Sequence, residues 1–278
     1  MHKLPSFDRV PRAVAIDLDG TLLDSRSRLS ARNTAAVGGC VARGLPVVIA
    51  TSRPARSVRR LVGDELVQAC SLVLQNGAVT RGTIPLYGTT VEALSPQIVK
   101  GIVEFSLSIQ PNARVVVETG GDKFAASAIL DPVRLWEVNS ATPDMVLSMD
   151  EAMAIGPTKV AINGMGCDLS EVADGIAGLF GEKVSIIRAD GMTFLNIVGP
   201  NVSKPVALQH LLQSNGMTLA DVLAFGDDIP DVDMLCACGF PVAVANACDE
   251  VMAVARFRTA SNDDDGVALV LERLLGYL

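Results

Sequence analysis

The stretch VAIDLDGT, from Val14 to Thr21, runs three apolar residues directly into two carboxylates, Asp17 and Asp19. Side chains of a strand alternate between its faces, so these two acids point the same way if the strand continues through them. Two carboxylates held close together repel each other, and one keeps its proton unless a cation lies nearby. Asp-Gly is also a strong turn dipeptide, so a simple turn is the competing interpretation. The remainder of the sequence has to decide between a pair of acids that binds a cation and a simple turn.

The composition describes a globular chain with an acidic surface. The chain has 278 residues, of which 49% are hydrophobic and 4% aromatic, so we expect a core made mostly of aliphatic side chains, in one large domain or two modest ones. The formal net charge of −8 argues against sequence-independent binding to nucleic acid or to an anionic membrane, which requires a basic surface. A phosphorylated ligand would need a local positive field from a metal ion, a few basic side chains and backbone amides.

The numbers and spacing of cysteines and histidines limit the metal sites and the kinds of catalysis that the chain can support. The six cysteines include no C-x-x-C pair, so a structural zinc site is not expected, and they are interpreted as small buried residues of a reducing compartment. The sequence has no signal-peptide core and no run of about 18 apolar residues, so we expect a cytoplasmic protein. With only two histidines, catalysis has to depend on carboxylates, lysine and a metal.

Both ends of the chain alternate apolar strands with helices. Strands that are apolar on both faces and separated by helices predict a parallel α/β sheet. A helix is expected from Ser30, an N-cap residue, to Gly44, and another begins near Lys204 behind Ser203. The expected strands are RAVAIDL (12–18), PVVIATS (46–52), SLVLQNG (71–77), VLAFGDD (222–228) and PVAVAN (241–246).

Residues 81–188 show a different pattern, in which pairs of expected strands are mixed with expected helices. Such a mixture predicts an inserted domain of ~100 residues, a typical size for a small domain. We therefore expect a Rossmann-like parallel-sheet core formed by residues 1–80 and 189–278, with residues 81–188 as an α/β cap domain. Glycine-bearing crossings at 77–82 and 189–191 are the expected hinges.

Polar residues follow several of the expected core strands. In an open parallel sheet, ligands bind beyond the carboxyl ends of the strands. Acids there can hold Mg²⁺, which prefers oxygen ligands, while a threonine hydroxyl and a lysine ammonium can bind phosphate. These are the parts that phosphoryl transfer requires. The residues are Asp17 and Asp19 after the first strand, Thr51, Ser52 and Arg53 after the second, Asp227, Asp228 and Asp231 after a later one, and Lys204 at a helix start.

Each of these residues has a simpler interpretation when taken singly. Thr51 can merely end a strand, and Lys204 can be a solvated residue at a helix start. Asp227 and Asp228 can belong to a loop, and Asp231 can favour the first turn of the next helix. The functional interpretation depends on all of them lying at strand ends of one sheet.

Taken together, the motifs resemble those of the haloacid dehalogenase (HAD) superfamily of phosphatases, in its Cof-type (type IIB) branch with a large α/β cap. The resemblance covers nearly the whole chain, and DLDGT is only moderately specific until it is combined with the later lysine and G-D-x-x-x-D. The matching stretches are DLDGT (17–21), ATSRP (50–54), QNGA (75–78), VSKPVAL (202–208), GDDIPDVDML (226–235) and DGVA (265–268).

The resemblance implies a role for each matching residue. Asp17 would be the nucleophile that forms an aspartyl-phosphate, and Asp19 would be the general acid and base. Mg²⁺ would be held by Asp17, the backbone carbonyl of Asp19 and Asp227. The remaining roles would be support of the metal-bound waters (Asp228, Asp231) and binding of phosphate or substrate (Thr51, Ser52, Arg53, Asn76, Lys204).

The implied function is Mg²⁺-dependent hydrolysis of a small phosphorylated metabolite, such as a sugar phosphate, by a monomer or small homo-oligomer that binds neither nucleic acid nor membrane. A phosphotransferase or phosphomutase and a non-catalytic binding protein on the same fold are the alternatives. Two positions depart from the family pattern. Pro230 stands where the family usually has Asn, which puts the metal shell in question, and Ser52 stands where Gly is common.

Overall fold

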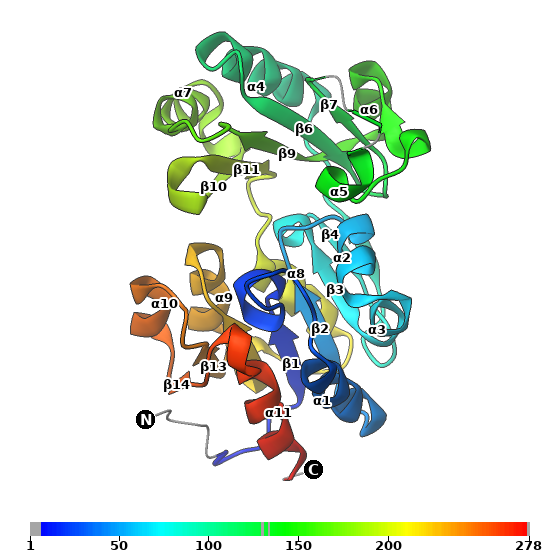
Figure 1. Cartoon of the computed structure of the whole chain (residues 1–278), viewed down its shortest axis with the longest axis vertical. Helices are drawn as coiled ribbons and strands as arrows, with labels where there is room; N and C mark the ends of the chain where they lie inside the picture. The colour runs from blue at the N-terminus through cyan, green and yellow to red at the C-terminus, as the bar shows by residue number, and fades with distance from the viewer. Residues whose placement is uncertain (1–6, 129–130, 133, 277–278) are drawn as a thin grey trace. The chain divides into compact units, whose positions relative to one another are not determined.

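The computed structural model describes residues 7–128, 131–132 and 134–276, which form two compact units (Figure 1). Unit 1 takes in the described residues of Met1–Thr51, Val58–Thr89 and Ser203–Leu278. Unit 2 takes in those of Ser52–Ser57 and Thr90–Val202. That each unit folds as an independent domain stays a prediction, and the second unit extends to Val202 and not to residue 188.

The sheet of unit 1 confirms the expected parallel core. Its order is β14-β13-β12-β1-β2-β3-β4-β5, and each neighbouring pair from β14 to β3 is parallel, while β4 runs antiparallel to β3. The carboxyl ends of β12, β1 and β2 therefore lie side by side at one edge. The strands are β1 (Ala13–Ile16), β2 (Val47–Ala50), β3 (Ser71–Leu74), β4 (Val79–Arg81), β5 (Thr89–Val91), β12 (Val222–Gly226), β13 (Phe240–Ala243) and β14 (Phe257–Arg258).

Helices follow these strands in the chain, as the sequence predicts. They are α1 (Ala31–Ala42), α2 (Ala55–Val62), α3 (Asp64–Ala69), α8 (Lys204–Gln213), α9 (Val232–Ala237), α10 (Asp249–Val254) and α11 (Gly266–Leu275). α1 begins after Ser30, whose hydroxyl accepts a hydrogen bond from the Asn33 amide at 3.0 Å. Such a cap satisfies one of the backbone N–H groups that the first turn of a helix leaves unpaired.

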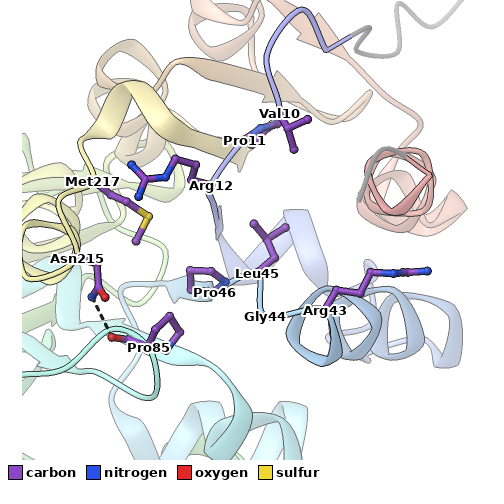
Figure 2. Close-up of a pocket in the computed structure, with 10 residues that line it drawn as sticks. All are labelled: Val10, Pro11, Arg12, Arg43, Gly44, Leu45, Pro46, Pro85, Asn215 and Met217. Atoms are coloured by element: carbon purple, nitrogen blue, oxygen red, sulfur yellow. Dashed lines mark hydrogen bonds between the residues drawn. The ribbon is translucent and has the colours of Figure 1, made fainter.

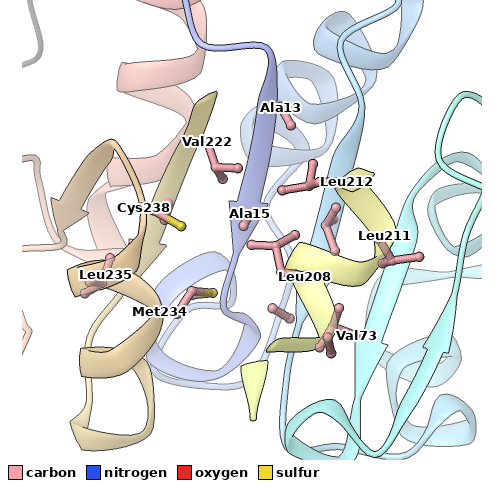
Figure 3. Close-up of a cluster of buried hydrophobic side chains, with 14 of the residues drawn as sticks. Ala13, Ala15, Val73, Leu208, Leu211, Leu212, Val222, Met234, Leu235 and Cys238 are labelled. Atoms are coloured by element: carbon pink, nitrogen blue, oxygen red, sulfur yellow. The ribbon is translucent and has the colours of Figure 1, made fainter. Parts of the chain in front are cut away.

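One face of this sheet is covered by the apolar stripe of α8 and by α9 and α10 (Figure 3). Leu208 and Leu212 of α8 pack in one buried cluster with Ala13 and Ala15 of β1. Val14 and Ile16, the alternate residues of β1, are equally buried, as expected when both faces of a parallel sheet are covered. The packing fixes the start of α8 against the sheet, and therefore the position of Lys204.

Unit 2 contains a mostly antiparallel sheet in the order β10-β11-β9-β6-β7-β8. Its strands are β6 (Arg114–Thr119), β7 (Phe124–Ala126), β8 (Val146–Leu147), β9 (Pro157–Asn163), β10 (Ser185–Ala189) and β11 (Phe194–Val198). Its helices are α4 (Pro96–Ile109), α5 (Leu135–Asn139), α6 (Met149–Ile155) and α7 (Ser170–Phe180), of which α4, α6 and α7 share the buried apolar cluster of the sheet. Within the described part of the chain, no helix is both long enough and apolar enough to cross a membrane.

The strand pair expected around Asp190 and Gly191 is present, but residues 189–191 are not a crossing between the two units. That turn was expected to be a crossing between domains, but it joins the antiparallel strands β10 and β11, with Gly191 at φ 58°. β11 also pairs with β9, so the second sheet continues to Val198. The physical reason is that the mostly apolar β11 finds antiparallel partners on both sides in this sheet, β10 and β9. The chain returns to unit 1 only at Ser203.

Candidate active site

A buried lysine bridges two aspartates at the carboxyl edge of the unit 1 sheet. Lys204, the first residue of α8, places its Nζ 2.6 Å from Oδ1 of Asp17 and 2.7 Å from Oδ1 of Asp231. Asp17 directly follows β1, and Asp231 lies in the turn after β12. All three side chains are at most 9% exposed. Buried charges of this kind are stable only when they are paired at close range, as these are.

Asp227 completes a group of three carboxylates. It follows β12, the strand next to β1, and one oxygen from each of Asp17, Asp227 and Asp231 lies within 4.8 Å of the others. Thr21 donates a hydrogen bond from Oγ1 to Oδ1 of Asp227 at 2.6 Å, which joins the turn after β1 to the turn after β12. Thr21 belongs to the DLDGT motif, but nothing in the sequence indicates this contact.

The charges of this group do not balance, because three carboxylates face one ammonium. Burial raises the pKa of Asp17 well above its usual range, and the charges of Asp231 and Asp227 add to this effect against the opposing Lys204. Burial likewise raises the pKa of Asp227 to about 7, although the hydrogen bond from Thr21 acts in the other direction. Burial would lower the pKa of Lys204, but the two adjacent carboxylates outweigh it and raise the pKa.

This excess of negative charge, carried by oxygen donors only, fits a hard divalent cation. A cation beside Asp17 and Asp227 would replace the protons that the raised pKa values retain. The same observation separates the two interpretations of the D-L-D-G stretch, because a plain turn gives no reason to gather three acids beside a buried lysine.

Asp231 has both carboxylate oxygens occupied by other protein groups. Oδ1 accepts from Lys204, and Oδ2 accepts from the backbone amides of Asp227 at 3.1 Å and Asp228 at 3.4 Å. These contacts suit a supporting role, in which Asp231 orients Lys204 and the Asp227 turn. Pro230 fits at the start of the turn Ile229–Asp231, where a missing N–H costs no helical hydrogen bond.

Asp19 lies in the turn after β1 and not on the strand itself. β1 ends at Ile16, and the turn Leu18–Leu22 holds Asp19 at φ −82° and ψ 123° and Gly20 at φ 77°. The side chain of Asp19 is not one of the three clustered carboxylates. The expectation that Asp17 and Asp19 share a strand face therefore does not apply, because the strand stops before both of them.

Thr51 and Asn76 lie at the ends of neighbouring strands. Thr51 follows β2, is buried, and its carbonyl accepts from the Asn76 amide at 3.0 Å. Gln75, Asn76 and Gly77 all have positive φ, and a Cβ on Gly77 would lie 2.7 Å from the carbonyl carbon of Ser203. This left-handed turn therefore packs closely on the residue that precedes Lys204. Oδ1 of Asn76 is buried without a hydrogen-bond partner in the described chain, so it can accept one from a ligand.

Ser52 and Arg53 follow Thr51 in the segment that belongs to unit 2. Lys159 of β9 donates from Nζ to the Ser52 carbonyl at 2.7 Å. Two residues further on, the guanidinium of Arg56 forms two hydrogen bonds, of 2.7 and 2.8 Å, with the carboxylate of Glu118 on β6. The segment after Thr51 is therefore fixed to the unit 2 sheet by buried charged side chains, a connection that no motif in the sequence signalled.

Replacement of Lys159 by Met is expected to change how stability depends on pH. Burial lowers the pKa of Lys159 to about 8 from 10.5, helped by Arg56 and Arg53 and opposed by Glu118. The unfolded chain therefore binds the extra proton between pH 8 and 10.5, so this group makes the wild type more stable as the pH rises through that window. The drop in pKa corresponds to roughly 3 kcal/mol.

Urea unfolding of wild type and Lys159→Met at several pH values from 7 to 10.5 measures this effect. As the pH rises, the free energy of unfolding of the wild type should increase relative to that of the variant. Lys100→Met, which changes an exposed side chain on α4, is the control and should run parallel to the wild type. A constant difference between wild type and Lys159→Met over the whole range would contradict the lowered pKa.

Gly20→Ala should damage the acidic site directly. Gly20 has φ +77°, and a Cβ there would overlap the Asp227 carboxylate, lying 2.9 Å from its Cγ. We expect a loss of about 1–2 kcal/mol in the free energy of unfolding from the left-handed backbone alone, and weaker binding of Mg²⁺ in titration calorimetry. Gly38→Ala, in α1 with no atom within 4 Å of the new Cβ, is the control and should be neutral or stabilising. Equal Mg²⁺ affinity in both variants would contradict the close fit.

A cavity of about 420 Å³ lies at the opposite end of the unit 1 strands (Figure 2). Its lining includes Arg12, Pro46 and Met217, which come just before β1, β2 and β12. The figure also shows the side chain of Arg43 pointing away from Pro46 and Met217. None of the clustered acids lines this cavity, so it is separate from the site described above.

Comparison with known proteins identifies the family. Residues 14–271 match the family model of haloacid dehalogenase-like hydrolases. The chain belongs to this family. The resemblance noted in the sequence is thus confirmed for a HAD-type hydrolase, and a HAD subclass IIB sugar phosphatase shares the fold at 20% identity with a TM-score of 0.78, covering 96% of this chain and 100% of that one. A HAD-like hydrolase from Bacteroides thetaiotaomicron does so at 23% identity and a TM-score of 0.79, covering 95% and 99%.

Two HAD-family relatives of similar length carry phosphatase names. The 5-amino-6-(5-phospho-D-ribitylamino)uracil phosphatase YitU of Bacillus subtilis is 27% identical over 267 residues, which cover 94% of this chain and 97% of that protein. The phosphoglycolate phosphatase of Methanothermobacter thermautotrophicus is 25% identical over 272 residues, covering 96% and 100%. The names of these relatives differ in the substrate that they state.

Proposed function

We propose that this HAD-family hydrolase is a phosphatase that hydrolyses a small phosphorylated metabolite, such as a sugar phosphate, through an aspartyl-phosphate on Asp17. The observation that carries the proposal is the contact of one buried ammonium, that of Lys204, with both Asp17 and Asp231 beside Asp227. An ammonium beside a nucleophilic carboxylate can also neutralise the phosphoryl oxygens that approach it. The phosphatase names of full-length relatives support the same reaction class.

In the first step, Asp17 attacks phosphorus and the bond to the leaving oxygen breaks. Lys204 binds Oδ1 of Asp17, so the second carboxylate oxygen, Oδ2, forms the new bond to phosphorus. Asp19 gives its proton to the leaving oxygen, so that an alcohol departs. Thr51 and the backbone amide of Ser52 hold the phosphoryl oxygens. Lys204 keeps the acyl-phosphate oriented, because Asp231 fixes its ammonium from the other side.

In the second step, water hydrolyses the aspartyl-phosphate. Asp19 now accepts a proton from the water, whose oxygen attacks phosphorus while the bond to Asp17 breaks. Inorganic phosphate leaves, and both aspartates return to their starting states. Asp19 therefore donates a proton in the first half-reaction and accepts one in the second, while Asp17 forms and then loses its bond to phosphorus.

Mg²⁺ is the cation proposed for the three carboxylates. Asp17, Asp227 and the backbone carbonyl of Asp19 would hold it, with Asp228 and Asp231 supporting its waters. When bound, it supplies positive charge to the phosphoryl oxygens and removes the repulsion among the acids. The choice of Mg²⁺ over softer metals depends on the all-oxygen donor set, since none of the six cysteines is among the clustered ligands.

A panel of sugar phosphates and p-nitrophenyl phosphate tests the proposal with the purified protein. We expect release of inorganic phosphate with Mg²⁺, in an amount equal to the alcohol formed, and none after chelation with EDTA. Equal amounts distinguish hydrolysis from transfer of the phosphoryl group to a second sugar. Turnover that is indifferent to EDTA, or no turnover of any ester, would overturn the assignment.

The remaining expectations concern location and partners. We propose a cytoplasmic enzyme, because all six cysteines are unpaired thiols, as in a reducing compartment. Its net charge of −8 disfavours nucleic acid and anionic membranes as partners. We propose a monomer or a small homo-oligomer, which gel filtration coupled to light scattering would measure.

A further inference from the structure

Three asparagine side chains converge on the backbone that follows Asp19. Nδ2 of Asn246 donates to the Gly20 carbonyl at 2.7 Å, that of Asn33 to the Leu22 carbonyl at 3.1 Å, and that of Asn262 to the Leu23 carbonyl at 2.9 Å. We call these three residues the asparagine clamp. Two of them come from distant parts of the sequence, since Asn246 is 226 residues from Gly20 and Asn262 is 239 residues from Leu23, whereas Asn33 is 11 residues from Leu22.

The orientation of the clamp amides follows from their second contacts. Oδ1 of Asn246 accepts from the Asn262 backbone amide at 3.0 Å, and Oδ1 of Asn33 accepts from the Ala268 amide at 2.9 Å. Each of these two side chains therefore donates with one end and accepts with the other, which only an amide can do here. An aspartate in the same place would turn an oxygen towards a carbonyl oxygen and add charge near an already acidic group.

The clamped backbone needs such donors because its conformation is irregular. Asp19 and Gly20 lie inside the turn Leu18–Leu22 with non-helical angles, so carbonyls of this segment cannot be satisfied by a regular helix or by the sheet. The same segment contacts Asp227 through Thr21 and through the close approach of Gly20. A shift of this turn would move Asp19 and Asp227 relative to Asp17.

We propose that Asn33, Asn246 and Asn262 are positioning residues that set the geometry of Asp19 and of the acidic metal site by holding the carbonyls of Gly20, Leu22 and Leu23. The inference rests on the proposed roles of Asp17, Asp19 and the Mg²⁺ site. The clamp residues are not among the proposed ligands of substrate or metal. They act through the backbone that follows Asp19 and contacts Asp227. Supporting residues of metal sites commonly contribute about 10–100-fold to affinity or activity.

Asn246→Asp is the informative variant because Asn246 is exposed, whereas Asn33 and Asn262 are buried and their variants can fail to fold. Asn215→Asp is the matched control. Nδ2 of Asn215 also donates to a backbone carbonyl, that of Pro85 at 2.9 Å, but beside the cavity at the other end of the sheet (Figure 2). Both variants remove an amide donor and add one negative charge, so they differ mainly in position.

The first measurement compares kcat/KM for an alkyl phosphate and for p-nitrophenyl phosphate. A displaced Asp19 protonates the leaving oxygen poorly, which matters for an alkoxide but little for nitrophenolate. We expect Asn246→Asp to lower kcat/KM about tenfold or more for the alkyl ester and clearly less for the aryl ester. Asn215→Asp should leave both values unchanged, and general damage to the fold would lower both equally.

The second measurement is Mg²⁺ binding by titration calorimetry, which needs no substrate and so separates the clamp from the proposed reaction. We expect about tenfold weaker binding for Asn246→Asp and wild-type binding for Asn215→Asp. Should the wild type hydrolyse no ester, the proposed function fails while this comparison still decides the clamp. Equal Mg²⁺ affinity in the two variants, or a loss of kcat/KM shared equally by both esters, overturns the inference.

Discussion

Asp17→Asn should abolish turnover of every phosphate ester that the wild type hydrolyses, with a loss in kcat of about 10⁴-fold or more. An amide oxygen is too weak a nucleophile to form the acyl-phosphate, so neither half-reaction can begin. The measurement is release of inorganic phosphate at saturating substrate and Mg²⁺. A rapid acid quench should recover protein-bound phosphate from the wild type and none from the variant.

This loss should occur in a well-folded protein. Asp17 is buried in a group of three carboxylates beside a single ammonium, and burial together with the neighbouring acids raises its pKa well above its usual range. Removing its charge relieves that repulsion, so without Mg²⁺ the variant should be at least as stable as the wild type. Asp233→Asn, an exposed acid two residues beyond Asp231, should retain full activity. Residual turnover by Asp17→Asn within a few-fold of wild type would refute the nucleophile assignment.

Lys204→Met should have the largest effect on stability. Its ammonium is 4% exposed and lies 2.6 and 2.7 Å from two buried carboxylates, which would both lose their counter-charge. Breaking a buried ion pair by removing one partner costs about 3–5 kcal/mol. We expect a loss of that size in the free energy of unfolding without metal, together with a fall in kcat of about 10²-fold or more because the phosphoryl oxygens lose their cation.

Two further measurements test whether the lost counter-charge causes the loss of stability in Lys204→Met. The double variant Lys204→Met with Asp231→Asn removes one of the two stranded acids and should recover part of the lost stability. Millimolar Mg²⁺ should stabilise Lys204→Met more than it stabilises the wild type. Lys100→Met, whose side chain is 72% exposed, should unfold like the wild type. If Lys204→Met were as stable as Lys100→Met without metal, the buried pairing would not be the cause.

The parts of the fold and site that could be predicted from sequence are those with local signals. Apolar strands separated by helices predicted the parallel sheet, and that rhythm placed Asp17, Thr51 and Asp227 at the ends of its strands, although not which strands are neighbours. Lys204 follows Ser203, a typical N-cap residue, so its position at the start of a helix could also be predicted from the sequence. In these cases the periodicity of a strand or helix determines where the neighbouring polar residue emerges.

Other features depend on contacts between distant segments and have no local signal. A single asparagine such as Asn246 looks like any loop residue, and nothing near it in sequence indicates that it reaches Gly20. β11 is almost entirely apolar, which suits either sheet, so the sequence could not show which one it joins. The turn after Asp17 was indicated by Asp19-Gly20 only as an alternative, because the apolar run continues to Leu18. The ion pair of Arg56 with Glu118 joins residues 62 positions apart.

The pairing of β1 with β12 has a consequence for biosynthesis. Residues 13–16 leave the ribosome early, yet their partner residues 222–225 emerge only after the whole intervening sequence has been translated. Until then one edge of β1 has no partner strand from the second half of the sheet, and an unpaired apolar edge invites association with other nascent chains. Prematurely terminated products would carry Asp17 but lack the lysine and the later acids, so they would be catalytically inert.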